Sequence, residues 1–496
     1  MPLFCFTKAF FFTKLEHMSS QLARNTVHLT VATLGQKAIA FVYFLFVARL
    51  MMPTQTGIYF LAISLATVFS VISDFGITPV VIREVAKNPK DTQMILQRVL
   101  GVKIPLLFLG YFVSVVTTFF LGYESQVFHL VFLTSFILFL DSISLLLYGV
   151  LRGQQKLSVE SFGLFVGQIV SAVLGGIVLV VAPSLVLLLT ALLFGSLTNV
   201  VISGTAIYKQ FGASPFYPVW QKAFVLKLFR AALPFALAAI FVKVYSYIDT
   251  LFISKLLGAH EVGLYSIAYK FTYAFQFLPL AFVAALYPSF SSVIDSDRVA
   301  LARMFNRAMW YMLILATPLV LGIWLIADHA VLLAGVEYRD SAPVLAVLVF
   351  VLFPIFLDFP IGSLLNAAGW QAKKTMIMGF TMLISIALNA LFIPVFGIIG
   401  AAYAALISFV FMLLAGLFYV PQLIPTFRFR NLFMQFLQVG TSGLVMILVG
   451  RFLLLYMHWI LLIPVCVFVY VCGLFLTQAV KREDLVSLVH ILQKKI

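Results

Sequence analysis

The chain has 496 residues, of which 63% are hydrophobic and only 10% are charged, and its formal net charge is +15. A soluble domain carries about 25% charged residues to cover its surface, so the composition excludes a string of soluble domains and predicts a protein that crosses a membrane several times. The three cysteines, Cys5, Cys466 and Cys472, are too few for a disulfide framework or a cysteine-rich metal site.

About fourteen apolar segments are long enough to cross a bilayer, which requires about 20 mostly apolar residues. Each is expected to be a helix, because lipid offers backbone polar groups no other partner. The segments cover residues 27–48, 58–75, 99–121, 127–150, 159–182, 185–207, 230–254, 263–286, 308–327, 344–368, 375–395, 399–420, 434–456 and 459–479.

The basic residues are distributed unequally over the connecting segments. With the N-terminus inside, most of them fall on the inner side, and the outer loops hold only Arg49, Lys255, Arg339 and Arg451. Cytoplasmic segments of membrane proteins carry such an excess of Lys and Arg. The pattern predicts cytoplasmic N- and C-termini, and it accounts for the basic charge without a nucleic-acid partner.

An internal repeat relates the two halves of the chain. The stretch 48–62, ARLMMPTQTGIYFLA, aligns without gaps with 254–268, SKLLGAHEVGLYSIA, at an offset of 206 residues. The offset also places Lys37 on Lys243, and the matching pairs within the stretch are Arg49 with Lys255, Gly57 with Gly263 and Tyr59 with Tyr265. The first span and the seventh differ by six places in the order of spans, an even number, so the halves have the same orientation and are related by an axis along the membrane normal.

The repeat predicts the domain organisation. An N-terminal cytoplasmic segment (1–26) precedes an N-lobe of six helices (27–207), and a cytoplasmic linker (208–229) leads to a C-lobe of six helices (230–420). Two further helices (434–479) and a cytoplasmic tail (480–496) complete the chain. No loop is long enough for a soluble catalytic domain, and the motifs of nucleotide-binding and hydrolytic enzymes are absent from the sequence. We therefore expect neither an enzyme nor a metal site.

The informative residues are the ionisable ones inside spans, since each costs roughly 2.5–3.5 kcal/mol at the bilayer centre on insertion scales. Lys37 shares a polar helix face with Thr33, and Lys243 shares one with Tyr247. Two repeat-related helices thus each offer a central lysine, which predicts a cationic cavity for an anionic substrate. Lys270, a third candidate, lies among tyrosines. The alternative is that Lys243 forms a structural ion pair with Asp249 or Asp141.

Acidic residues inside spans are candidates for binding a coupling ion, H⁺ or Na⁺, and these are Asp249, Asp141 and Asp358. Asp74 and Glu160 lie near cytoplasmic ends, where solvated or helix-terminal roles are expected. Lys103 is close to the same interface and is expected to extend its amine to water. Gly163, Gly167 and Ser171 recur at four-residue spacing, which indicates close helix packing.

Several short stretches together resemble the multidrug/oligosaccharidyl-lipid/polysaccharide exporter superfamily, and in particular its bacterial polysaccharide transporters of the O-antigen flippase type. They are LARNT (22–26), ARLMMPTQTGIYFLA (48–62), SDFGITPVVIREVAK (73–87), YIDTLFISKLLGAHEVGLYSIAYKF (247–271), LYPSF (286–290), LNAAGWQAKK (365–374) and LNALFIPVFGIIGAAYAALIS (388–408). The resemblance implies an all-α, MATE-like fold with two six-helix lobes around a central cavity and two extra C-terminal helices.

The resemblance also implies a protein of the bacterial plasma (inner) membrane. It would flip a polyprenyl-diphosphate-linked oligosaccharide, such as an O-antigen or exopolysaccharide repeat unit, from the cytoplasmic to the outer leaflet by alternating access. The expected partners are that lipid-linked substrate, membrane lipid, and polysaccharide polymerase and chain-length proteins; no cofactor is expected. A lipid II flippase and a multidrug/cation antiporter of the same superfamily stay open as alternatives. A membrane-embedded polysaccharide polymerase or ligase is the alternative from a different class.

Overall fold

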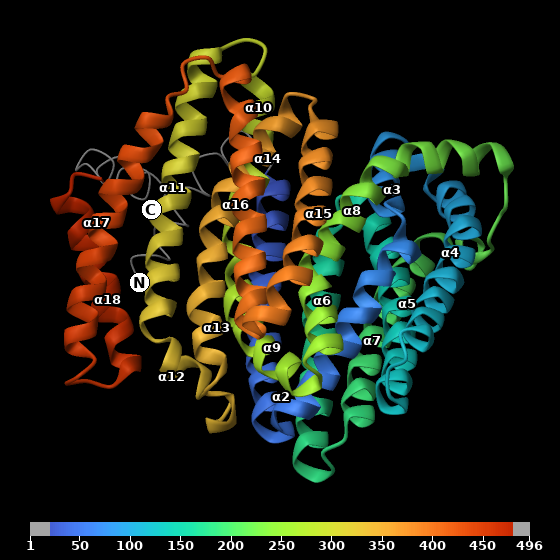
Figure 1. Cartoon of the computed structure of the whole chain (residues 1–496). Helices are drawn as coiled ribbons and strands as arrows, with labels where there is room; N and C mark the ends of the chain where they lie inside the picture. Colours follow the sequence, from blue (N-terminus) through green and yellow to red (C-terminus); the bar gives the residue numbers. More distant parts are fainter. Residues whose placement is uncertain (1–19, 480–496) are drawn as a thin grey trace. The chain divides into compact units, whose positions relative to one another are not determined.

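The structure is a computed structural model that describes residues 20–479, and for residues 20–32 and 281–285 it describes the backbone alone. The expected C-terminal tail (480–496) and most of the expected N-terminal segment (1–26) lie outside the described residues. Helices joined by short turns make up the described chain, which contains no strand (Figure 1). The expected all-α membrane fold is confirmed.

The helices divide between two compact units, each described by itself. Unit 2 comprises Arg24–Ile267 and Met378–Ala401. Its helices are α2 (Ser20–Asp74, apart from its first residues), α3 (Ile77–Lys87), α4 (Thr92–Phe120), α5 (Ser125–Gly153), α6 (Leu157–Val181), α7 (Leu185–Phe211), α8 (Lys222–Leu256), the first part of α9 (Ala259–Tyr273), and most of α15 (Gln371–Phe396).

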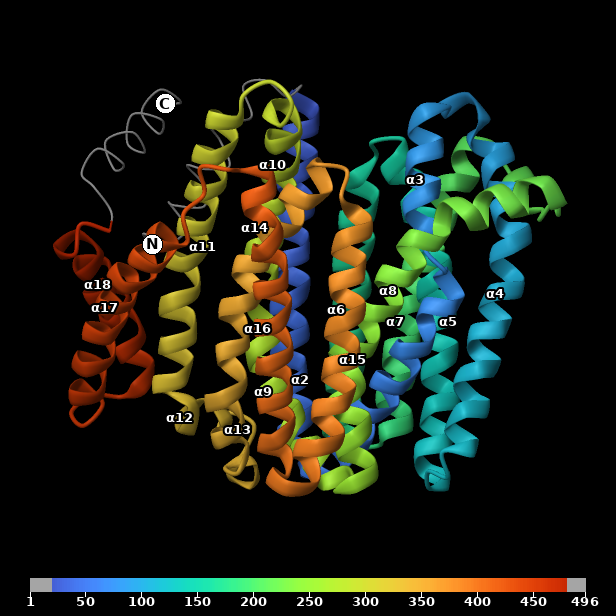
Figure 2. The same cartoon turned by 45° about the horizontal axis from the view of Figure 1, so that its top comes forward.

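Unit 1 contains Ala268–Ile377 and the residues from Ala402 on. Its helices are the end of α9, α10 (Phe277–Val293), α11 (Arg298–Leu325), α12 (Ala327–Val331), α13 (Ser341–Leu348), α14 (Leu352–Ala367), the start of α15, most of α16 (Ile398–Leu423), α17 (Phe429–Leu453) and α18 (Trp459–Leu476). Helices α17 and α18, the two expected extra helices, pack side by side (Figures 1 and 2). The predicted division into lobes at 208–229 stays a prediction.

Twelve helical segments of the described chain are long and apolar enough to cross a membrane. One of them, Thr33–Asp74, has 42 residues, and a continuous helix of that length would measure about 63 Å, twice the ~30 Å hydrocarbon core. It covers the first two expected spans. The eighth expected span, 263–286, falls on α9, a short 3₁₀ turn (Ala274–Gln276) and α10, so this segment is interrupted rather than a single long helix.

The break in α2 lies at Met52, whose backbone has φ 65° and ψ 164°. The residue before a proline is pushed toward extended ψ values, and Pro53 follows here. At the equivalent position of the second half, 206 residues on, Gly258 has φ +103°. Both halves therefore separate their first two spans at a residue with positive φ, a conformation that glycine adopts easily and methionine only under strain.

Immediately after these breaks, the second span of each half contacts its own repeat equivalent. A Cβ atom on Gly57 would lie 1.8 Å from the carbonyl oxygen of Ala259, and one on Gly263 would lie 1.9 Å from that of Pro53. Pro53 and Ala259 are themselves 206 residues apart, so the contact is reciprocal, as in a two-fold symmetric interface. The pair Thr54 and His260, at the same offset, has Oγ1 and Nδ1 3.4 Å apart. A local two-fold relation therefore passes between α2 and α9.

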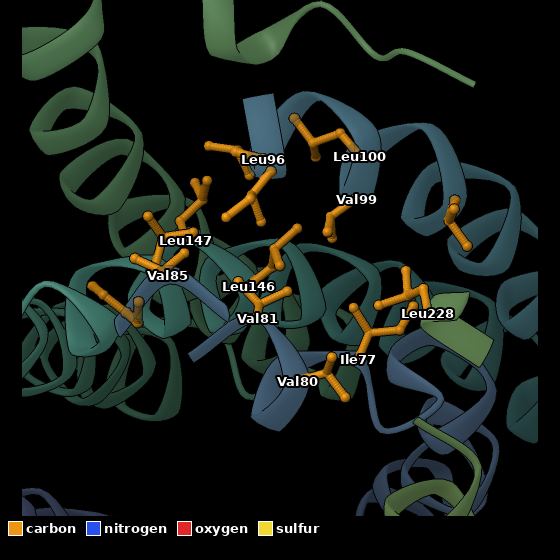
Figure 3. Close-up of a cluster of buried hydrophobic side chains, with 14 of the residues drawn as sticks. Ile77, Val80, Val81, Val85, Leu96, Val99, Leu100, Leu146, Leu147 and Leu228 are labelled. Atoms are coloured by element: carbon orange, nitrogen blue, oxygen red, sulfur yellow. The ribbon is translucent and has the colours of Figure 1, made fainter. Parts of the chain in front are cut away.

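Two further packing regions organise unit 2. Figure 3 shows apolar side chains of α3, α4, α5 and α8 meeting in one buried cluster, among them Val81, Val99, Leu146 and Leu228. On α6 and α7, small residues permit direct helix contact: a Cβ on Gly167 would lie 3.0 Å from the Gly195 carbonyl oxygen, and one on Gly195 would lie 1.9 Å from Ser171 Oγ. The expected packing role of the small residues in α6 is confirmed.

Gly57→Ala and Gly263→Ala each place a methyl group where the backbone of the partner helix lies. Because backbone cannot rotate away like a side chain, we expect each variant to lose about 1–3 kcal/mol of stability or more and to accumulate less in the membrane. Thermal unfolding of the purified protein in detergent measures the effect. Gly176→Ala is the control, since nothing lies within 4 Å of its added Cβ. Equal behaviour of all three variants would contradict the reciprocal contact.

Candidate functional site

Lys37 on α2 and Lys243 on α8 lie in unit 2 within electrostatic reach of each other. Lys37 is exposed and Lys243 is half-buried, with its Nζ 6.0 Å from the centroid of the Tyr247 ring. Neither lysine has a carboxylate within ion-pair distance among the described side chains. Two like charges at repeat-related positions of two spans are thus within electrostatic reach of each other and have no carboxylate partner among the described side chains. An anion would stabilise such an arrangement.

The alternative role for Lys243, a structural ion pair with Asp249 or Asp141, is not present in the described chain. Asp249 is 4% exposed, and it accepts hydrogen bonds from the Tyr265 hydroxyl and from the Thr250 backbone N–H, the latter at 2.6 Å. Asp141 is instead hydrogen-bonded by the Ser196 hydroxyl. Both carboxylates therefore have neutral donors as partners, and neither forms an ion pair with Lys243.

Asp249 and Tyr265 have repeat equivalents that also meet. Subtracting 206 gives Tyr43 and Tyr59, which are electrostatic neighbours in the first half. The Tyr43 hydroxyl is buried and has no hydrogen-bond partner in the described chain. The two halves therefore keep a contact between equivalent residues, but the residues differ chemically. The second half has the carboxylate of Asp249 where the first half has the phenol of Tyr43.

Asp358, the third predicted ion-binding carboxylate, is fully engaged. Both of its oxygens lie 2.6 Å from Lys374 Nζ, in unit 1. Lys374 lies between the expected spans 344–368 and 375–395, and the sequence does not indicate this contact between α14 and α15. Neighbouring Lys373 lies over the Trp370 ring at 3.2 Å. No helical spacing signals the Asp358–Lys374 pair, because its members are 16 residues apart on different helices.

Two more ion pairs correct expectations from the sequence. Lys103 Nζ lies 2.6 Å from Asp74 Oδ1, and the lysine side chain is 0% exposed, so the expectation that its amine reaches water is wrong. Glu160 is 2% exposed and binds Arg152 through both oxygens, so the solvated role is wrong, although the residue does lie in the first turn of α6. These pairs neutralise buried charge and leave no ionised group for a substrate.

The other predicted substrate-binding residues are not part of the lysine pair. Thr33 is half-buried on α2, four residues before Lys37. Lys270 is half-buried on α9 in unit 1, next to Tyr269, whose ring centroid lies 4.3 Å from that of Tyr273. The polar residues predicted to share a face with Lys243 have different surroundings. Thr250 is buried against Asp249, whereas Tyr247 is half-buried.

An apolar cavity begins one residue after Lys37 along α2. It has a volume of about 590 Å³ and lies between α2 and α6. Its lining from α2 includes Ala38, Val42 and Phe46, and its lining from α6 includes Ala172 and Val180. Val42, Phe46 and Val180 are more than half exposed. On α2, the positive charge of Lys37 is therefore followed directly by apolar residues that line the cavity. No three His, Cys, Asp or Glu side chains in residues 20–479 gather in a way that could hold a metal ion.

The fold and these residues define a multi-pass α-helical membrane protein. A family profile described as "Polysaccharide biosynthesis protein" matches residues 22–294, which is more than half of the chain, and a MatE profile matches residues 234–391. The chain therefore belongs to the polysaccharide biosynthesis protein family, and the predicted resemblance is confirmed.

Two curated relatives come from Haloferax volcanii. The chain is 23% identical over 393 residues to "Probable low-salt glycan biosynthesis flippase Agl15", covering 78% of this chain and 81% of that protein. It is 26% identical over 207 residues to "Probable flippase AglR", covering 41% of this chain and 44% of that protein. The chain thus spans less than half the length of AglR.

Solved structures share the fold. "Lipid II flippase MurJ, inward closed conformation" has a TM-score of 0.70 at 17% identity and covers 90% of this chain and 98% of its own. An inward-facing multidrug resistance MATE family transporter of the MOP superfamily has a TM-score of 0.67 at 14% identity, covering 79% and 96%. The MATE-like architecture predicted from the sequence is confirmed.

Tyr265→Phe removes a donor from the buried Asp249 carboxylate without changing the size of the ring. We expect the variant to lose about 1–2 kcal/mol of stability, because a buried acceptor then lacks one partner. Thermal unfolding in detergent measures the loss. Tyr208→Phe is the matched control, since Tyr208 is 57% exposed. If both variants unfold at the wild-type temperature, the hydroxyl does not support the carboxylate.

Proposed function

We propose that this protein flips a polyprenyl-diphosphate-linked oligosaccharide from the cytoplasmic to the outer leaflet by alternating access. The observation that carries the proposal is the pair Lys37 and Lys243: two cationic groups from repeat-related helices, close together and without a carboxylate partner among the described residues. A diphosphate presents several acceptor oxygens and at least two negative charges. It therefore matches two ammonium groups, and charge-assisted hydrogen bonds to phosphate are among the strong ones.

Lysine suits a substrate that must move on. An ammonium group is a point charge with rotatable donors, whereas the arginine fork fixes a bidentate geometry. A diphosphate can pass from one lysine to the other while each ammonium group turns with it. The two lysines hold the charged group without defining one rigid orientation, which is what a transport step requires.

The apolar cavity beside Lys37 supports a lipid-linked substrate rather than a soluble anion. Its α2 wall runs from Ala38 to Leu50, a rise of about 18 Å at 1.5 Å per residue. A polyprenyl chain attached to a diphosphate at Lys37 can follow this wall, because the wall is apolar and partly open. The headgroup and the chain of the substrate are thus matched by neighbouring parts of the same helix.

The distribution of basic residues supports the proposed orientation. With both termini cytoplasmic, the inner segments hold most of the basic residues, as is usual for proteins of the plasma membrane. The lipid-linked glycan is loaded from the side on which cytoplasmic sugar nucleotides are available, and it leaves toward the enzymes that polymerise it. Polymerase and chain-length proteins are the expected partners on the outer side.

The alternative functions require binding sites of different charge. A cation antiporter would need an acidic binding site, and the paired lysines disfavour one. A lipid II flippase is the closer alternative, since it too would carry a lipid-linked diphosphate, and the fold is similar to that of MurJ. The sugar portion of the substrate separates these two proposals. A polymerase or ligase is disfavoured, because the relatives are flippases by name.

Lys37→Ala and Lys243→Ala should each abolish surface polysaccharide and leave lipid-linked repeat units in the inner leaflet. Losing one charged hydrogen bond weakens the binding of the diphosphate by roughly 10- to 100-fold. Arg should restore part of the transport because it keeps the charge, Gln should not, and Glu should be worse than Ala because it repels the anion. Export in a deletion strain, with membrane abundance measured in parallel, tests the series.

A purely structural lysine would behave differently. Its removal would lower protein abundance, and the double variant Lys243→Gln/Asp249→Asn would recover both abundance and export. The hydrogen bonds that Asp249 receives from Tyr265 and Thr250 predict no such recovery. Lys209→Gln is the control for loss of a positive charge, because Lys209 is exposed at the end of α7. Wild-type export of a cationic drug that is unaffected by the lysine changes would favour the multidrug alternative.

We also propose that Asp249, Asp141 and Asp358 bind or relay the coupling ion, H⁺ or Na⁺. Asn at Asp249 or Asp141 keeps the shape of the side chain, so transport should fall while abundance stays. Asp358→Asn also leaves Lys374 without its carboxylate, and abundance should fall there as well, because a half-buried charge loses its partner. Ion-gradient-driven transport in proteoliposomes is the measurement. Normal transport by all three variants would show that none of these carboxylates couples an ion.

A further inference from the structure

We propose that a second lipid site, separate from the lysine pair, lies among α3, α4 and α8 in unit 2 and binds the anionic headgroup of a membrane phospholipid. The cavity has a volume of about 260 Å³. Three basic side chains line it, one from each helix: Arg83 from α3, Arg98 from α4 and Lys227 from α8. We call it the α3–α4–α8 cavity. It is independent of the transported substrate.

The floor of the α3–α4–α8 cavity is rigid and apolar. Val80, Val81, Val99 and Leu228 line it and also belong to the buried cluster in Figure 3. Phe224 forms part of the wall, and the Arg98 guanidinium carbon lies 5.8 Å from the centroid of its ring. The half-buried Arg98 side chain is thus held by packing rather than by a carboxylate.

Two of the three basic side chains that line the cavity have no carboxylate partner among the described side chains. Arg83 forms an ion pair with Glu84, with Nε and Oε1 3.2 Å apart. Asp91 also lines the cavity. Neither Arg98 nor Lys227 has a carboxylate within ion-pair distance among the described side chains. A guanidinium and an ammonium group facing one small cavity are the donors that a phosphate needs.

The surroundings favour a lipid over a free anion. Small-molecule pockets are usually about 300–1,000 Å³, so the cavity holds a headgroup and leaves the acyl chains outside. Met94, which lines the cavity, is 39% exposed, and Leu226 on the adjoining turn of α8 is 56% exposed. These apolar side chains offer a surface for acyl chains next to the headgroup.

The cavity also lies where a headgroup is expected. The segment leading into α8 exposes Tyr217 by 67% and Trp220 by 62%, and exposed aromatic residues of this kind gather at the membrane–water interface. Figure 1 shows the first turns of α8 lying across the helix ends of unit 2, at a steep angle to the rest of the helix. The surrounding exposed cations are Lys87, Lys90, Lys222 and Arg230. In the proposed orientation these residues lie on the cytoplasmic side, where basic pockets between membrane-spanning helices bind anionic headgroups.

The test measures lipid binding to the purified full-length protein in detergent. Phosphatidylglycerol should raise the unfolding temperature saturably, whereas phosphatidylcholine and inorganic phosphate at equal concentration should not. Arg98→Gln and Lys227→Gln should each weaken the apparent affinity for phosphatidylglycerol by about tenfold. Arg98→Lys should retain part of it, and Lys209→Gln, an exposed charge outside the cavity, should leave it unchanged.

Three outcomes would overturn the site. Equal weakening by Lys209→Gln would mean that the lipid responds to overall positive charge. An equal effect of inorganic phosphate would mean that the cavity takes a free anion and not a lipid. Unchanged phosphatidylglycerol affinity in Lys227→Gln would place the lipid elsewhere; this variant is informative even if Arg98→Gln folds poorly, because Lys227 is exposed.

Discussion

An ionised side chain inside hydrocarbon must find a partner, and this constraint orders the polar chemistry of the chain. Each unpaired charge costs several kcal/mol, and the described spans meet the cost mostly with ion pairs. The pairs are Asp74 with Lys103, Arg152 with Glu160, and Asp358 with Lys374. Asp249 uses hydroxyl and amide donors instead. Against that background Lys37 and Lys243 stand out, because they are close to each other and neither has a carboxylate partner in the described chain.

The spans could be predicted from the sequence because hydropathy is a local property. A run of about 20 apolar residues has one stable conformation in lipid, and its position can be read without knowing its neighbours. The interruption between α9 and α10 could not be predicted in the same way, since Ala274–Gln276 contains neither a glycine nor a proline that would indicate a break. The break at Met52 was signalled only in part, by Pro53.

The part of the candidate site formed by repeat-equivalent residues could be predicted from the sequence. The offset of 206 residues matched Lys37 to Lys243, and the two lie within electrostatic reach. Partners on other helices were not predictable. Lys374 lies outside the expected spans 344–368 and 375–395, yet it binds Asp358 on the preceding helix, and Lys103 is buried against Asp74 rather than extended to water. Which faces of two helices meet depends on tertiary packing, and the periodicity of one helix contains no information on its neighbour.

The repeat explains why the asymmetry at Asp249 matters. Gly57 and Gly263 must both lack a side chain, because each meets the backbone of the partner repeat, so packing holds the two halves to one pattern. The equivalent positions 43 and 249 do not follow one pattern, since they hold a tyrosine and a carboxylate. A transporter that treats its halves alike needs no difference there. One that couples movement to an ion needs titratable groups, and Asp249 is one of the three carboxylates that we propose for this role. A repeat altered on one side supplies it without changing the contact on which both halves depend.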